Sequence, residues 1–180
     1  MIKIVDNFFH KEVASKLHAS AVKQEKLNKN FNGYEAIDYL ENFNTDEFNN
    51  KFPELIGTKL TRSWGFIYQN NVEGVPPHAD PADLNLNVWL TPNECINDKE
   101  KNGMKIWLIK PPPEWSFISY NSNTEKIINY IGTEKPLDIP YKFNRAILFD
   151  SKYFHATSGV SMKEGKLNRR VSFTFLFDKT

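Results

Sequence analysis

The stretch Pro76-Pro77-His78-Ala79-Asp80-Pro81 places an imidazole and a carboxylate two residues apart. The two prolines favour an extended chain in front of His78. In an extended chain, successive side chains point to opposite faces, so His78 and Asp80 would lie on the same face. A second histidine, His155, follows the strand-like segment Ala146-Ile147-Leu148-Phe149. We therefore expect His78, Asp80 and His155 to converge on one site.

Two histidines and one carboxylate are the ligands of the facial triad, which holds non-haem Fe(II) and leaves other coordination positions open. Neutral imidazoles and one carboxylate suit a divalent ion bound with moderate affinity. A single His-x-Asp pair is by itself a weak signal, so the interpretation depends on the order and the strand context of the other parts.

Two adjacent arginines precede the strand-like end of the chain. Strand alternation puts Arg170 on a polar face with Ser172 and Thr174, whereas Val171 begins an apolar face that is rich in phenylalanine. An arginine fork can bind a carboxylate through two parallel hydrogen bonds. We predict that Arg170 faces a pocket and that Arg169 is exposed at the start of the strand.

The order His-x-Asp, a distant His, and then Arg-x-Ser on a closing strand resembles the Fe(II)/2-oxoglutarate-dependent oxygenases. The resemblance implies that Fe(II) binds at His78, Asp80 and His155. It implies that 2-oxoglutarate binds at Arg170 and Ser172, and that O2 is the second co-substrate. The implied reaction converts 2-oxoglutarate to succinate and CO2 and hydroxylates a substrate that the sequence does not identify. Retention of Asp80 argues against halogenation, because the related halogenases lack that carboxylate.

The resemblance covers the chain from about Thr61 onward. The segments from His78 to Pro92 and from Pro140 to Asp150 are similar to a bacterial subgroup of these oxygenases. Some members of that subgroup are fused to tetratricopeptide repeats, and no such repeats occur in this sequence. The resemblance to that subgroup therefore implies no partner role for this chain.

Residues 62–68 alternate as a strand and share one face through Arg62, Trp64, Phe66 and Tyr68. Many members of the family carry a pocket tyrosine shortly before the first histidine ligand, and Tyr68 stands in that place. A tyrosine that merely packs in the strand is an equal alternative. We expect Trp64 to line the pocket from the same face.

Residues 84–90 also alternate without a break. One face is apolar and consists of Leu84, Leu86, Val88 and Leu90. The other face consists of Asn85, Asn87 and Trp89, which would meet water in an ordinary strand but would line the pocket of a β-helix. We favour the pocket, with Trp89 beside the co-substrate.

The six or more short alternating strands expected after Thr61, together with the resemblance, predict a mainly β (α+β) fold, a double-stranded β-helix of the jelly-roll or cupin-like kind with the N-terminal helix packed on one sheet. Residues 2–5 alternate as a short strand, and residues 11–23 have helical spacing, with His18 on the helix surface. One or two short helices are expected in residues 24–60, which carry the aromatic residues Phe31, Tyr34, Tyr39, Phe43, Phe48 and Phe52. A strand is expected at Met104–Ile109 and a helix at Asn123–Ile131, with Ser122 and Glu125 as its capping box. The chain then forms a single domain, 1–180, in which residues 1–60 support a core of residues 61–180 with an insertion at 111–138.

The composition gives no support to several classes of function, although it leaves a nucleic-acid demethylase open. The net charge is +1 and no long basic run occurs, so nothing indicates a nucleic-acid partner. No stretch is long and apolar enough for a membrane span, and the N-terminus lacks the apolar run of a signal peptide. Cys95 is the only cysteine, so an intrachain disulfide cannot form and a reducing, cytoplasmic compartment fits best.

Two other classes stay open. A cupin-like barrel could bind a small molecule without turnover, and it would then consume no 2-oxoglutarate. A metal-dependent isomerase or lyase would usually need three histidines and a glutamate, and the remaining His10 and His18 are both N-terminal. The sequence does not separate protein, amino-acid and small-metabolite substrates, and it leaves the oligomeric state open.

Overall fold

The computed structural model describes residues 1–24, 29–31, 33–38, 43 and 45–180. Tyr39 lies outside the described residues, as does the side chain of Phe31, so the aromatic pattern predicted for this region is described only in part.

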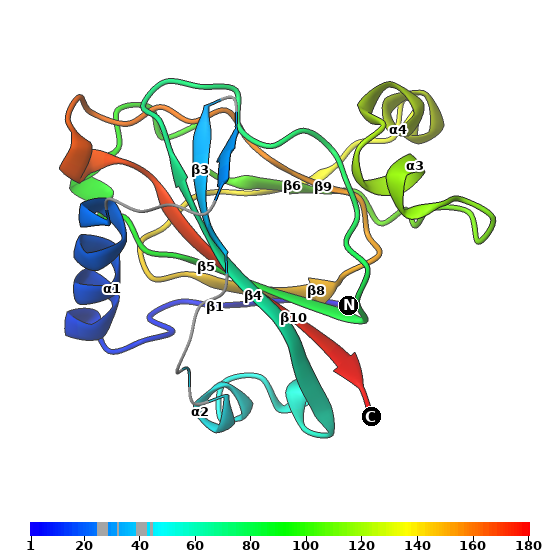
Figure 1. Ribbon diagram of the computed structural model, residues 1–180, viewed down its shortest axis with the longest axis horizontal. Coiled ribbons are helices and arrows are strands. Elements are labelled where there is room, and N and C mark those ends of the chain that lie inside the picture. Colours follow the sequence, from blue (N-terminus) through cyan, green and yellow to red (C-terminus); the bar gives the residue numbers. More distant parts are fainter. Residues whose placement is uncertain (25–28, 32, 39–42, 44) are drawn as a thin grey trace.

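The described strands form two antiparallel sheets that pack face to face (Figure 1). The larger sheet has the spatial order β1 (Ile2–Val5), β8 (Ala146–Asp150), β5 (Leu84–Trp89), β10 (Val171–Lys179), β4 (Thr58–Tyr68), β3 (Tyr34–Asp38) and β2 (Lys29–Phe31). The smaller sheet has the order β7 (Leu137–Ile139), β6 (Met104–Ile106) and β9 (His155–Thr157). The predicted mainly β, double-stranded β-helix fold is confirmed.

The helices lie at the margins of these sheets. Helix α1 (Lys11–Lys23) and helix α2 (Asp46–Asn49) contribute Ala14, Ala21 and Phe48 to the core cluster on the outer face of the larger sheet. Helices α3 (Phe117–Asn121) and α4 (Thr124–Ile131) lie together at the opposite side of the molecule from α1 (Figure 1). Short 3-10 turns span Pro53–Leu55, Asn93–Cys95 and Lys166–Asn168. Among the described residues, no helix has both the length and the apolar character needed to cross a membrane.

The register of the central strands decides which side chains point between the sheets. Ser172 of β10 lies opposite Phe66 of β4 and Trp89 of β5. Since directly opposite residues share a face, these side chains and their neighbours two positions along point inward. Leu86 and Val88, by contrast, join Phe173 and Phe175 in the outer core beneath α1 and α2. The predicted division of β5 into an apolar face and an asparagine-bearing face is confirmed.

Two local predictions were wrong. Helix α4 begins at Thr124, and its N-cap is Asn123, whose side chain accepts a hydrogen bond from the Lys126 amide at 3.0 Å. Ser122 is not that cap, because it ends the preceding helix α3, which the sequence did not predict. Strand β6 ends at Ile106 rather than at Ile109, although the backbone of Trp107 and Ile109 still forms hydrogen bonds with that of Phe154.

His18 was predicted on the helix surface, and this was also wrong. Its side chain is buried, and Nε2 donates a hydrogen bond to the Arg169 carbonyl oxygen over 3.1 Å. Burial lowers the pKa of His18 below its ordinary value, only partly opposed by that hydrogen bond. A buried, neutral histidine therefore ties α1 to the loop in front of β10.

Candidate metal centre

His78, Asp80 and His155 come together between the two sheets. The segment that carries His78 runs beside β9, with backbone hydrogen bonds of 3.0 Å from His78 N to His155 O and 2.8 Å from His155 N to His78 O. Gly74, with φ of +64°, permits this approach, because a Cβ there would lie 2.8 Å from the Thr157 carbonyl oxygen. One potential ligand atom from each of the three residues lies within 4.8 Å of the others.

The backbone selects the tautomer of both histidines. His78 Nδ1 lies 2.9 Å from the Pro76 carbonyl oxygen, and His155 Nδ1 lies 2.9 Å from the Tyr153 carbonyl oxygen. A carbonyl oxygen only accepts, so each Nδ1 carries the proton and each Nε2 keeps a lone pair. The two Nε2 atoms lie 3.9 Å and 3.4 Å from the oxygens of Asp80. Two imidazole lone pairs and one carboxylate therefore point at a shared space, as metal ligands do.

The charge states also suit a metal. Burial, together with the neighbouring His155, lowers the pKa of His78 to about 4, so its imidazole is neutral near pH 7. Burial alone would raise the pKa of Asp80, but the adjacent imidazoles of His155 and His78 and the hydrogen bond from Asn85 lower it below its ordinary value. The site thus offers a neutral imidazole at His78 and an ionised carboxylate at Asp80 without a prior change of protonation.

Arg170 occupies a separate position on the same inner surface. Its side chain is 1% exposed, and Nε donates to the Asn102 carbonyl oxygen at 2.9 Å. One of its terminal nitrogens lies 3.4 Å from Ser172 Oγ. Among the residues that the structure describes, no carboxylate lies within ion-pair distance of this guanidinium. Because a buried cation without a counter-charge is costly, Arg170 is suited to receive an anion.

Aromatic rings enclose the Arg170 guanidinium. Its central carbon lies 4.7 Å from the ring centre of Tyr68, 5.7 Å from that of Trp89 and 5.6 Å from that of Tyr141. The Tyr68 hydroxyl is 3.1 Å from Thr157 Oγ1. These rings keep water away from the guanidinium and strengthen any charge-assisted bond that it makes.

Tyr141 is a residue that sequence reasoning missed. Its ring stacks on Trp89 at 5.2 Å, and its hydroxyl donates to the Thr91 carbonyl oxygen at 2.7 Å. Burial raises the pKa of Tyr141 above its ordinary value, although the Arg170 charge opposes this. Tyr141 lies in a loop, where no periodic pattern reports which way a side chain points.

Arg169 behaves differently from the prediction. It is half-buried, because its guanidinium forms an ion pair with Glu35 at 3.0 Å and donates to the carbonyl oxygens of Tyr68 and Ile67. The expected exposure was wrong, since β3 brings Glu35 to the edge of β4 beside it.

The polar inner face of β5 connects the two halves of the site. Asn85 Nδ2 donates to Asp80 Oδ2 at 2.9 Å. Asn87 donates to Thr174 Oγ1 at 2.8 Å and accepts from Trp89 Nε1 at 2.8 Å. One strand thus carries side chains that contact the Asp80 carboxylate at one end and the Arg170 guanidinium at the other.

A cavity of about 310 Å³ opens beside His78 and Asp80. Its walls include Tyr34, Trp64, Phe66, Phe117, Asn121 and Ser122. The indole N–H of Trp64 is buried and has no hydrogen-bond partner among the described residues. The cavity therefore has an aromatic wall next to the candidate metal ligands, and one residue of that wall, Trp64, has a buried donor without a partner among the described residues.

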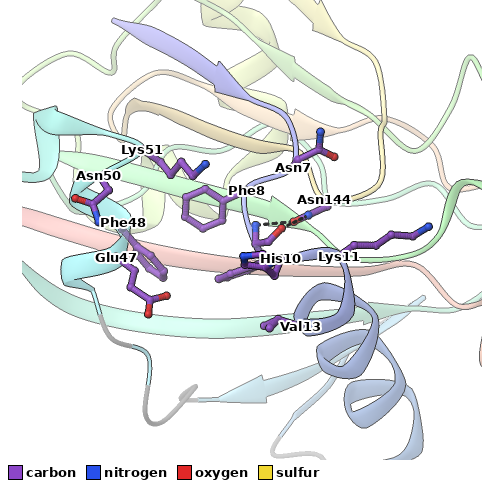
Figure 2. A pocket seen from close by; sticks show the side chains of 11 residues that line it. Asn7, Phe8, His10, Lys11, Val13, Glu47, Phe48, Asn50, Lys51 and Asn144 are labelled. Atoms are coloured by element: carbon purple, nitrogen blue, oxygen red, sulfur yellow. Dashed lines mark hydrogen bonds between the residues drawn. The ribbon is translucent and has the colours of Figure 1, made fainter.

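A larger cavity, of about 780 Å³, lies elsewhere, between the start of α1 and α2. Figure 2 shows its lining, with Asn144 hydrogen-bonded to the backbone of Phe9. None of the sequence-predicted site residues lines it. We refer to it as the α1–α2 groove.

No protein-family model matches the sequence, and a search of curated proteins finds no match. Solved structures do match. The chain aligns over 99% of its length with HygX from Streptomyces hygroscopicus bound to nickel and 2-oxoglutarate, covering 83% of that chain with a TM-score of 0.61 and 9% identity. It aligns over 99% with the non-haem α-ketoglutarate-dependent epimerase SnoN from nogalamycin biosynthesis, covering 78% with a TM-score of 0.65 and 10% identity. It aligns over 99% with a prolyl-4-hydroxylase from Pseudomonas putida, covering 92% with a TM-score of 0.61 and 11% identity.

The chain has the fold of the Fe(II)/2-oxoglutarate oxygenases. At these identities the likeness shows the fold, and the chemistry of the site depends on its own side chains.

Proposed function

We propose that the protein is a non-haem Fe(II)- and 2-oxoglutarate-dependent dioxygenase that hydroxylates a small substrate or a single side chain. One observation carries this proposal. Two imidazole lone pairs and a carboxylate converge on one space, while a buried arginine on the same inner surface has no carboxylate partner among the described residues. A metal ion and a dicarboxylate are the two ligands that these features fit together.

His78, Asp80 and His155 would hold the metal. The donor set, two nitrogens and one oxygen, suits Fe(II) and leaves positions for other ligands. The bonds from each Nδ1 to a backbone carbonyl fix the ring orientations before any metal arrives. His78 and Asp80 need no change of protonation near pH 7 before they bind the metal.

Arg170 and Ser172 would bind the distal carboxylate of 2-oxoglutarate. The guanidinium supplies a two-pronged contact, and Ser172 Oγ can add a further hydrogen bond. Tyr68, Trp89 and Tyr141 surround this end of the pocket and exclude water from it. The bound metal and co-substrate supply the oxidative chemistry, in which 2-oxoglutarate and O2 yield succinate, CO2 and an oxidised substrate.

The primary substrate would enter the cavity beside His78 and Asp80. A volume of about 310 Å³ is at the small end of ligand sites, which suits a small metabolite or one inserted side chain. Trp64 would donate its free indole N–H to an acceptor on the substrate. HygX has been solved with hygromycin B, and a prolyl hydroxylase from Trichoplax adhaerens with a peptide. Both small molecules and peptides therefore belong in the substrate search.

A reducing, cytoplasmic location is part of the proposal. The single cysteine, Cys95, is buried, and burial, with the nearby Glu94 charge, raises the pKa of its thiol. Such a thiol is mostly protonated and a poor nucleophile. A reducing compartment would also keep Fe(II) reduced.

The decisive experiment measures 2-oxoglutarate binding and consumption. Anaerobic protein loaded with Fe(II) should develop a metal-to-ligand absorption band on titration with 2-oxoglutarate. After addition of O2, succinate should form, and faster with one of a set of pooled metabolites and peptides. A non-catalytic binding barrel would form no succinate above the rate of Fe(II) and 2-oxoglutarate without protein.

A further inference from the structure

The carboxylate of Asp80 receives a hydrogen bond on each of its two oxygens from an asparagine. Asn85 Nδ2 donates to Oδ2 at 2.9 Å, and Asn121 Nδ2 lies 3.4 Å from Oδ1. Asp80 is 5% exposed and Asn85 is 1% exposed, so water competes little with these bonds. Bonds to a buried carboxylate restrict how it can rotate.

The two asparagines come from different parts of the fold. Asn85 lies on β5, whereas Asn121 is the last residue of α3, in the insertion. Asn121 Nδ2 also donates to the Ala79 carbonyl oxygen at 2.9 Å, and Ala79 N donates to the Tyr120 carbonyl oxygen at 2.9 Å. The end of α3 is therefore attached to the segment that carries His78 and Asp80, by backbone as well as side chain.

The Asn85 side chain leaves one group unused. Its Oδ1 is buried and has no hydrogen-bond donor among the described residues. The opposite orientation of the amide would bring this oxygen against the Asp80 carboxylate. The NH2 group therefore faces Asp80, and Oδ1 is left without a donor among the described residues. A buried acceptor without a donor lowers the stability of the fold. We infer that the hydrogen bond to Asp80 determines the orientation of the Asn85 side chain.

We propose that Asn85 and Asn121 are positioning residues of the metal centre, which hold the Asp80 carboxylate in one orientation from two sides. Through Asn121 the α3 insertion becomes part of the metal site, and through Phe117 and Ser122 the same insertion forms a wall of the substrate cavity. The inference rests on the proposed metal-binding function and adds residues that are not ligands.

The same strand offers a matched comparison. Asn87 lies two residues after Asn85 on the same face, and it is also buried and hydrogen-bonded. Its partners are Thr174 and Trp89 rather than Asp80. A general disturbance of the barrel would affect Asn85 and Asn87 alike, whereas only Asn85, of these two, contacts Asp80.

The experiment measures Co(II) binding and the Co(II) absorption spectrum, which depends on ligand geometry. Residues that orient a ligand typically change metal affinity by about 10- to 100-fold. Asn85→Leu, which keeps the side-chain volume, should weaken Co(II) binding by roughly that factor and alter the spectrum. Asn121→Ala should weaken it by a smaller factor, because its contact with Asp80 is longer. Asn87→Leu and Ser122→Ala should keep the wild-type affinity and spectrum.

The outcomes distinguish the positioning role of Asn85 and Asn121 from the existence of the metal centre itself. If Asn85→Leu and Asn121→Ala both bind Co(II) as the wild type does, the positioning role is overturned and the metal centre stands. If Asn87→Leu weakens binding as much as Asn85→Leu, the effect is general and the positioning role is again overturned. If Asp80→Ala binds Co(II) as tightly as the wild type, the metal centre itself is wrong. Thermal unfolding of each metal-free variant identifies misfolding, and Asn121→Ala, at the rim, tests the idea even if Asn85→Leu does not fold.

Discussion

The cavity beside His78 and the α1–α2 groove differ more in chemistry than in size. The groove is more than twice as large, about 780 Å³ against about 310 Å³. Its most buried polar side chain, Asn144, is satisfied by the backbone N–H and carbonyl of Phe9. Beside the smaller cavity lie a buried indole N–H without a partner, at Trp64, and a histidine whose pKa is strongly lowered, His78. Unsatisfied buried groups and shifted pKa values, rather than volume, distinguish a candidate site.

The largest expected effect is the loss of metal on changing a ligand. His155→Ala should abolish Fe(II) binding, because it removes one of three ligands and leaves Asp80 without its closest imidazole. Metal titration under anaerobic conditions measures this. His10→Ala, which changes a histidine that lines the α1–α2 groove, should bind Fe(II) as the wild type does. Equal loss of Fe(II) binding in both variants would contradict the assignment of the metal to the cavity beside His78 rather than to the α1–α2 groove.

The next effect concerns the two neighbouring arginines. Arg170→Ala should raise the 2-oxoglutarate concentration needed for half-saturation by roughly 10- to 100-fold, since charge-assisted hydrogen bonds contribute about 1.5–3 kcal/mol. Fe(II) binding should survive, because Arg170 is not a ligand. Arg169→Ala should change 2-oxoglutarate binding little, as its guanidinium is already paired with Glu35. Titration of the metal-to-ligand band measures both, and loss of the band in Arg169→Ala alone would reverse the assignment.

A smaller effect is expected at Trp64. Trp64→Phe keeps an aromatic ring in the wall and removes the unused N–H, so it should raise the KM for the primary substrate by about 3- to 10-fold, the worth of one neutral hydrogen bond. The 2-oxoglutarate requirement should not change. Lys51→Ala, in the α1–α2 groove, should leave both unchanged. The measurement is succinate formation with the substrate found in the search, and an unchanged KM in Trp64→Phe would remove the donor role.

The smallest effect concerns stability near the α1–α2 groove. The hydrogen bond from Arg145, helped by Lys142 and opposed by burial, lowers the pKa of Asp6 to about 2. A carboxyl whose pKa is lowered on folding stabilises the fold above its unfolded pKa of 3.8, and this contribution disappears as pH falls through about 2. Because Asp6 is 31% exposed, solvent screening limits the contribution to at most about 1 kcal/mol.

Asp6→Asn should therefore lower the melting temperature slightly at pH 7. The difference from the wild type should shrink as pH is lowered from 4 towards 2. Thermal unfolding at several pH values measures this. A difference that stays constant over that range would show that the ion pair is not its cause.

Several features could be predicted from the sequence because they depend on a local period. Strand alternation put Arg170 and Ser172 on one face and separated Asn85 and Asn87 from the leucines of β5, and the structure has these faces. The fold followed from the same alternation. The functional roles of these residues stay predictions that the experiments above test.

Other features depended on the path of the chain through space. The contact of Asn121 with Asp80 joins residues 41 positions apart, through a short helix with no buried residues of its own and thus no helical pattern to predict it. Tyr141 meets Arg170 from a loop, and His18 is covered because the loop before β10 passes over α1. The sequence alone thus determined which side of each strand faces inward, since the backbone repeats every two residues. Only the tertiary structure decided which loops and helix ends complete the site, because their contacts are set by packing between distant segments rather than by any repeat.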